Sequence, residues 1–147
     1  MRAAGKKDTT VLPRKEVIVI RVMVADDHPL VRLGLEAVLD DHLDLVHCGS
    51  AARGDTAVDL ALETEADVVL MDLSMPGLDG ISATRQILAA RPATRVVMLT
   101  WHTEADLVST ALAAGVSAYL IKDVETSDLL AAIRNTRTVS PSGSRIT

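Results

Sequence analysis

The sequence predicts an α/β fold in which one five-stranded parallel sheet carries helices on both faces. Strand-like and helix-like segments alternate five times along the chain, as in βαβ units that close a parallel sheet. Residues 68–71 and 96–99 are continuous apolar runs, which is typical of strands covered on both sides. Aromatic residues make up 1% of the chain and Phe is absent, so Leu, Val, Ile and Ala must build the core.

Each expected strand is a short apolar stretch that reads as buried and is followed by a polar residue or a turn. Residues 17–20 are ambiguous, because they either lengthen the first strand or belong to the segment before it. The five expected strands are residues 22–25, 43–48, 68–71, 96–99 and 118–121.

Helices are expected between these strands and after the last one. Pro29 suits the first position of a helix. Gly115 suits the left-handed cap that follows a helix ending at residues 113–114. Apolar residues at helical spacing mark three of the later helices. They are Ile81, Thr84 and Leu88; Leu107, Ala111 and Ala114; and Leu129, Leu130 and Ile133.

The length of 147 residues, 48% of them hydrophobic, fits one ordinary domain. Residues 1–18 are polar and contain Gly and Pro, so we expect a flexible N-terminal extension. The domain itself is expected over residues 19–138. Residues 139–147 are rich in Ser and Gly, which is typical of a linker, so we expect a further domain beyond them.

Charge and cysteine content narrow the function classes. A formal net charge of −5 argues against direct contact of this segment with nucleic acid. The single cysteine, Cys48, excludes an internal disulfide, so the reducing cytoplasm is the expected compartment. No apolar stretch is long enough to span a membrane.

Polar residues follow the expected strands at the edge of the sheet where ligands bind. Asp26 and Asp27 follow the first strand, Asp72 the third, Thr100 the fourth and Lys122 the fifth. Clustered carboxylates repel one another by about 1 kcal/mol per close pair even in bulk water, so they call for a cation. Mg²⁺ fits best, because it prefers oxygen ligands and commonly bridges to phosphate.

Asp72 precedes a loop, residues 73–80, that contains Pro76, Gly77 and Gly80. By itself this carboxylate is a metal ligand, a structural cap or a nucleophile, and carboxylates do form acyl phosphates. The Pro and Gly residues predict a tight turn whose backbone carbonyls complete a metal shell. This loop favours the nucleophile.

Three segments, residues 24–28, 71–80 and 114–123, together resemble the receiver domain of bacterial two-component response regulators, and most closely those of the NarL/FixJ family. The resemblance covers about residues 20–137 and implies the flavodoxin-like (βα)5 receiver fold. It also implies that Asp72 accepts a phosphoryl group, that Mg²⁺ is the cofactor, and that one aromatic residue reorients on activation. The other implied roles are metal binding for Asp26, Asp27, Asp72 and the Ser74 backbone carbonyl, phosphoryl contact for Thr100 and Lys122, and the switch aromatic for Tyr119.

The resemblance further implies partners. A sensor histidine kinase would supply the phosphoryl group, and a helix-turn-helix DNA-binding output domain would follow the linker. Receivers of this kind can self-associate, so a homodimer is one expected state.

Two other functions fit parts of the pattern. One is an interaction module that keeps the fold but acts without phosphorylation, although the complete acidic, Thr and Lys set argues against it. The other is a phosphohydrolase with Asp72 as nucleophile. Such an enzyme requires a second acidic residue two positions after the nucleophile, and Ser74 occupies that position. We therefore expect a signalling switch, not an enzyme that turns over an external substrate, with self-phosphorylation and self-dephosphorylation as its only chemistry.

Two neighbours of the site are less determined by the sequence. His28 follows the acidic pair and is not predicted to be a metal ligand. Trp101 replaces the small residue often found beside the switch hydroxyl. It shields the phosphoryl group, packs on a partner, or simply lies on a partly buried rim.

Overall fold

The computed structural model describes residues 18–135, and these residues form the predicted fold. Five parallel strands within this described part of the chain make one sheet in the order β3-β2-β4-β5-β6. The expectation of a doubly wound α/β domain is confirmed, with β4 at the centre of the sheet. The strands are β2 (Ile20–Ala25), β3 (Leu45–Ala51), β4 (Val68–Met71), β5 (Arg95–Thr100) and β6 (Ala118–Ile121).

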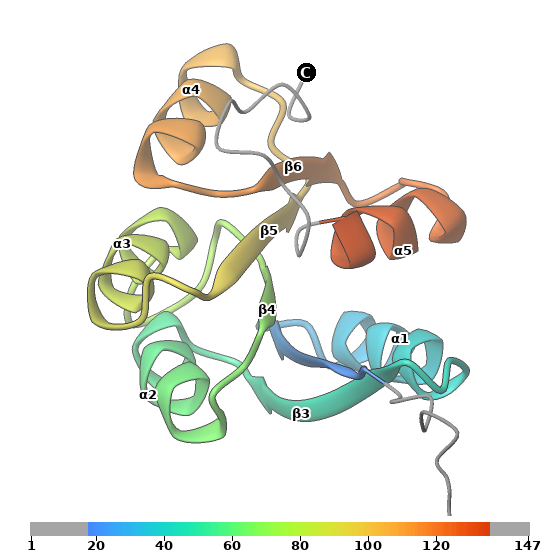
Figure 1. Cartoon of the computed structure of the whole chain (residues 1–147). Helices are drawn as coiled ribbons and strands as arrows, with labels where there is room; N and C mark the ends of the chain where they lie inside the picture. Colours follow the sequence, from blue (N-terminus) through green and yellow to red (C-terminus); the bar gives the residue numbers. More distant parts are fainter. Residues whose placement is uncertain (1–17, 136–147) are drawn as a thin grey trace, which may run out of the picture.

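Within residues 18–135, five helices cover the two faces of the sheet. Figure 1 shows α2, α3 and α4 on one face and α1 and α5 on the other. Each helix follows one strand, as the alternating pattern predicts. Their bounds are α1 (Pro29–Asp40), α2 (Gly54–Thr64), α3 (Gly80–Ala90), α4 (Ala105–Ala114) and α5 (Thr126–Asn135).

The sheet separates two apolar clusters, because successive side chains of a strand point to opposite faces. In β2, Met23 and Ala25 belong to the cluster under α2, α3 and α4, whereas Val22 and Val24 belong to the cluster under α1 and α5. All four residues of β4 are buried. The core is therefore aliphatic on both faces, and partly buried Tyr119 is an aromatic at its border.

Strand bounds agree with the sequence for β4 and β6, and β5 extends one residue beyond each predicted end. The predicted start of the second strand at residue 43 is wrong. Leu43 is 96% exposed and lies in the turn after α1, so β3 begins at Leu45 instead. Ile20 opens β2, whereas Ile18 and Val19 are exposed and precede the strand; Val17 lies outside the described residues.

The expectation that the last strand is buried is also wrong. Every residue of β6 is only partly buried, since this strand lies at the edge of the sheet and is covered less completely. The parallel β6 keeps its predicted position even so.

The one helix start and the one helix end that the sequence predicted are confirmed. Pro29 is the first residue of α1, and Gly115 caps α4 with a positive φ of 111°. Asp79 caps α3 by accepting a hydrogen bond from the Ser82 amide at 2.9 Å. The N-terminal extension, apart from Ile18, and the linker fall outside residues 18–135.

Among the described helices, none combines the length and the apolar character that crossing a bilayer requires.

Candidate functional site

The parallel register gathers the predicted site residues at one edge of the sheet. Ala25 of β2 is paired with Met71 of β4, so the next residues in the chain, Asp26 and Asp72, lie side by side. Their backbones continue the ladder, since the Asp72 amide donates to the Ala25 carbonyl at 2.9 Å. Asp26 and Asp72 are 2% and 4% exposed. The structure thus holds two carboxylates together in a place nearly closed to water.

Lys122 supplies the compensating charge. Thr100 and Ile121 are paired at the ends of β5 and β6, which brings Lys122 to the same edge. Its Nζ lies 2.7 Å from Asp26 Oδ2 and 3.2 Å from Asp72 Oδ2, and the lysine side chain is 5% exposed. The sequence predicted a pair with Asp72, but the shorter contact is with Asp26, so the ammonium bridges both acids.

The neighbours of Asp72 have opposing effects on the pKa of its carboxyl. Burial raises the pKa of this carboxyl most, and the neighbouring Asp26 raises it further; Lys122 and the Leu73 amide lower it but do not compensate. For Lys122, burial lowers the pKa of the ammonium, yet the two aspartates outweigh burial and raise it. The lysine is therefore held charged, and ionised Asp72 remains destabilised.

Replacing Asp72 by Asn is expected to stabilise the protein near neutral pH in the absence of divalent cations. Because the folded pKa of Asp72 is raised, the folded state binds more protons than the unfolded state above the unfolded pKa, and stability falls as pH rises through the folded pKa. The gain for Asp72→Asn should thus be near zero at about pH 4 and larger at about pH 7. Urea unfolding midpoints across this range measure it.

Asp59→Asn, on the exposed surface of α2, is the control and should lack this slope. An Asp72→Asn gain that shrinks as pH rises would contradict the raised pKa.

The acidic cluster has the donor set of a divalent cation. Ligand atoms of Asp26, Asp27, His28 and Asp72 all lie within 4.8 Å of one another. Asp27 Oδ1 is buried and makes no hydrogen bond, although His28 Nδ1 lies 3.0 Å from it. Oxygen donors with one buried, unsatisfied oxygen fit Mg²⁺, which takes hard oxygen ligands.

The loop between β4 and α3 is fixed by backbone contacts that glycine makes possible. The Gly80 amide donates to the Leu73 carbonyl at 2.7 Å, and the Gly54 amide of α2 donates to the Pro76 carbonyl at 3.0 Å. Gly77 has a φ of 83°, which disfavours residues with a Cβ. An open hollow beside Asp27 is lined by this loop. The loop therefore holds a defined shape next to the acidic residues.

His102 connects several parts of the site in a way that the sequence alone did not indicate. Its Nε2 is hydrogen-bonded to Ser74 Oγ at 2.9 Å, which joins the loops after β4 and β5. Its amide donates to Thr100 Oγ1 at 3.3 Å, and its carbonyl accepts from the Tyr119 hydroxyl at 2.8 Å. Thr100 is buried at the end of β5. Sequence separation gives no signal for such contacts.

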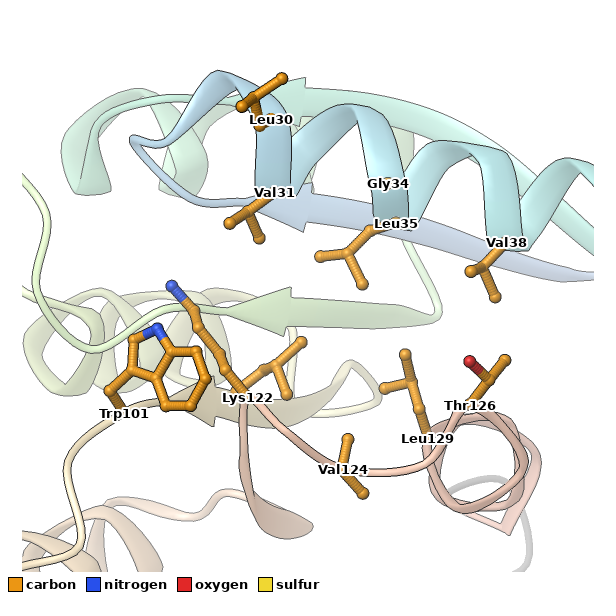
Figure 2. Close-up of a pocket in the computed structure, with 11 residues that line it drawn as sticks. Leu30, Val31, Gly34, Leu35, Val38, Trp101, Lys122, Val124, Thr126 and Leu129 are labelled. Atoms are coloured by element: carbon orange, nitrogen blue, oxygen red, sulfur yellow. The ribbon is translucent and has the colours of Figure 1, made fainter.

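Trp101 lies beside a groove between α1 and α5. The groove has a volume of about 250 Å³, and Figure 2 shows Trp101 and Lys122 among the residues that line it. Trp101 is 62% exposed. Its position matches an indole on a rim, although the side chain is more exposed than the partly buried rim that we expected. The other lining residues are mostly aliphatic, such as Val31, Leu35 and Leu129.

Comparison with known proteins agrees with this arrangement. The family model described as "Response regulator receiver domain" matches residues 22–134. The response regulator UvrY of Escherichia coli is 40% identical over 116 residues, covering 79% of this chain and 53% of UvrY. The transcriptional regulatory protein LiaR of Bacillus subtilis is 41% identical over 115 residues, covering 78% of this chain and 54% of LiaR. The chain thus spans about half the length of these relatives.

Among solved structures, the signal receiver domain of the putative response regulator NarL from Mycobacterium tuberculosis is similar to this one. The TM-score is 0.80 at 31% sequence identity, and the match covers 84% of this chain and 99% of that chain. The family model, the relatives and this structural match all agree with the resemblance that the sequence motifs indicated. The chain belongs to the response regulator receiver domain family, within the NarL/FixJ group.

Proposed function

We propose that this receiver takes a phosphoryl group from a sensor histidine kinase onto Asp72 and thereby switches an output domain. The observation that carries the proposal is the juxtaposition of buried Asp72 with Lys122, 3.2 Å away, and with Asp26 and Asp27. A buried carboxylate whose ionisation is unfavourable loses its own charge when it becomes an acyl phosphate, a mixed anhydride, because the negative charge then lies on phosphoryl oxygens. Lys122 is close enough to accompany that charge.

In the proposed transfer, an oxygen of Asp72 attacks the phosphorus of a phosphohistidine. A P–O bond forms, the P–N bond breaks, and the imidazole leaves with its electron pair. Leu73 orients the nucleophile, since its amide donates to Asp72 Oδ1 at 2.8 Å. Mg²⁺, when held by Asp26, Asp27, Asp72 and the Ser74 carbonyl, supplies positive charge that offsets the charge of the phosphoryl oxygens.

The output step follows from the contacts of His102. A phosphoryl group adds roughly 1.5 to 2 negative charges and three acceptor oxygens. The Thr100 hydroxyl accepts a hydrogen bond from the His102 amide. It would turn to donate to the phosphoryl group, so His102 would lose this hydrogen bond. The Tyr119 hydroxyl donates to the His102 carbonyl, so Tyr119 would be free to move when His102 moves. The loop leads into α4, so the surface of α4 and β6 is where a pre-existing equilibrium would shift.

The partners are proposed from the family. A sensor histidine kinase delivers the phosphoryl group, and a helix-turn-helix DNA-binding domain receives the signal in the parent protein. The similarity to UvrY and LiaR, of which this chain covers about half, supports a protein with more than a receiver. We propose a cytoplasmic protein that can form a homodimer, and whose receiver makes no direct contact with nucleic acid.

Intact-mass analysis after incubation with a small-molecule phosphodonor tests the proposal. We expect a single phosphate adduct that requires Mg²⁺ and is absent from Asp72→Asn. Asp59→Asn, on the exposed surface of α2, is the matched control and should form the adduct as the wild type does. No adduct on folded wild-type protein under any condition would instead favour the interaction module that acts without phosphorylation.

A further inference from the structure

Arg32 of α1 reaches back to the turn between β2 and α1, where the acidic residues lie. Its Nη1 donates to the Asp26 backbone carbonyl at 2.7 Å, in a contact that is partly buried. The guanidinium is charged, so this hydrogen bond is of the stronger kind. The Asp26 amide donates to the Ala51 carbonyl of β3 at 3.0 Å. The backbone of Asp26 is therefore held on both sides, by the sheet through its amide and by Arg32 through its carbonyl.

The Asp26 carbonyl belongs to the peptide group that joins Asp26 to Asp27. Because a peptide group is planar, a contact that fixes its carbonyl also fixes the direction in which the chain continues to Asp27. The Asp27 side chain is 35% exposed, and the His28 ring beside it is 64% exposed. Contacts between exposed charged groups fix a side chain only weakly. The placement of Asp27 thus depends mainly on its backbone, and through the backbone on Arg32.

Helix stability does not account for an arginine at this place. α1 begins at Pro29, so Arg32 is its fourth residue, and the first turn contains no acidic residue. The N-terminal end of a helix carries partial positive charge, which disfavours a nearby cation. Within residues 18–135, Arg32 forms no ion pair with a carboxylate. Its charge is directed instead at the backbone oxygen of Asp26.

We propose that Arg32 is a positioning residue of the metal site, because it holds the peptide group that orients the carboxylates of Asp26 and Asp27 towards one cation. The inference rests on the metal site of the proposed function. Mg²⁺ demands near-ideal octahedral geometry, so its affinity is sensitive to the placement of its ligands. A purely electrostatic role predicts the opposite effect, since removal of a positive charge beside the acids would strengthen cation binding.

Calorimetric titration of the untagged protein with Mg²⁺, without a phosphodonor, tests the inference. Arg32→Met, which keeps a long side chain without the guanidinium, should weaken Mg²⁺ binding about tenfold. Arg32→Gln, which is too short to reach the carbonyl, should do the same. Arg32→Lys retains the charge and a donor, so it should recover part of the loss. Arg85→Met removes an exposed arginine from α3 and is the matched control, with an affinity within about twofold of the wild type.

Phosphorylation rates over a series of Mg²⁺ concentrations separate positioning from a loss of structure. Arg32→Met and Arg32→Gln should need about tenfold more Mg²⁺ for the half-maximal rate, yet reach the wild-type rate at saturation. Urea unfolding without Mg²⁺ identifies the variants that are folded. Unchanged or tighter Mg²⁺ binding by either folded variant would overturn the inference, as would a rate that stays low at saturating Mg²⁺. The calorimetry involves no phosphodonor, so a failure of phosphoryl uptake leaves its result intact.

Discussion

Gly80→Ala is expected to unfold the domain or to destabilise it by more than about 4 kcal/mol, well beyond the effect of most point substitutions. A Cβ on residue 80 would lie 2.1 Å from the Asp72 carbonyl oxygen and 3.0 Å from Leu73 Cα. Both are backbone atoms, which no side-chain rotation can move away. Relief requires a shift of the strand end that carries the proposed phosphoacceptor. Urea unfolding, followed by circular dichroism, measures the loss.

Two other glycine substitutions serve as comparisons for Gly80→Ala. Gly54→Ala should be as damaging, because its Cβ would lie 1.8 Å from the Leu78 carbonyl oxygen. Gly34→Ala is the matched control, since its Cβ would meet nothing within 4 Å in the interior of α1. It should stabilise the protein by about 0.5–1 kcal/mol through the gain in helix propensity. Similar midpoints for Gly80→Ala and Gly34→Ala would show that the loop yields easily.

Lys122→Met is expected to lower the free energy of unfolding by about 3–5 kcal/mol at neutral pH without divalent cations. The substitution keeps the length of the side chain but leaves Asp26 and Asp72, both nearly closed to water, without their shared cation. Because burial and Asp26 already raise the pKa of Asp72, the variant should regain stability as pH falls and one carboxyl is protonated. Added Mg²⁺ should restore part of the loss for the same electrostatic reason.

The matched control is Arg53→Met, which removes the cation of an ion pair with Asp55 whose side chains are about half exposed. Solvent screens this pair, so its removal should leave the urea midpoint close to the wild-type value. Equal effects of the two substitutions, or a Lys122→Met variant that is insensitive to pH and Mg²⁺, would mean that Lys122 does not offset buried charge.

Much of the fold was predictable from the sequence, because short apolar runs mark the strands and apolar residues at helical spacing mark the helices between them. The apolar run at residues 68–71 matches β4 in both bounds, and Pro29 and Gly115 mark helix ends through backbone geometry that few other residues tolerate. Leu43 was misplaced because an apolar residue in an exposed turn looks like a strand residue when neighbours in space are unknown. The partial exposure of β6 depends on strand order, which local patterns do not encode.

The site was predictable to the extent that parallel strands end together. That rule places Asp26, Asp72 and Lys122 at one edge, but it does not say which carboxylate lies nearer the ammonium. The bridge between Ser74 and His102, and the position of the His28 ring, depend on side-chain rotamers and loop paths. Such contacts join residues whose separation in the chain carries no periodic signal.

The division of the apolar interior into two clusters by the sheet bears on how this protein can change over time. Residues that contact only α1 and α5 share no packing partners with those beneath α2, α3 and α4, so substitutions on opposite sides should add nearly independently. Substitutions can therefore accumulate on one face of the sheet and change its binding specificity, while the other face keeps its packing and its own specificity. Only the strands contribute residues to both clusters, so the strands have to remain compatible with the packing on both faces of the sheet.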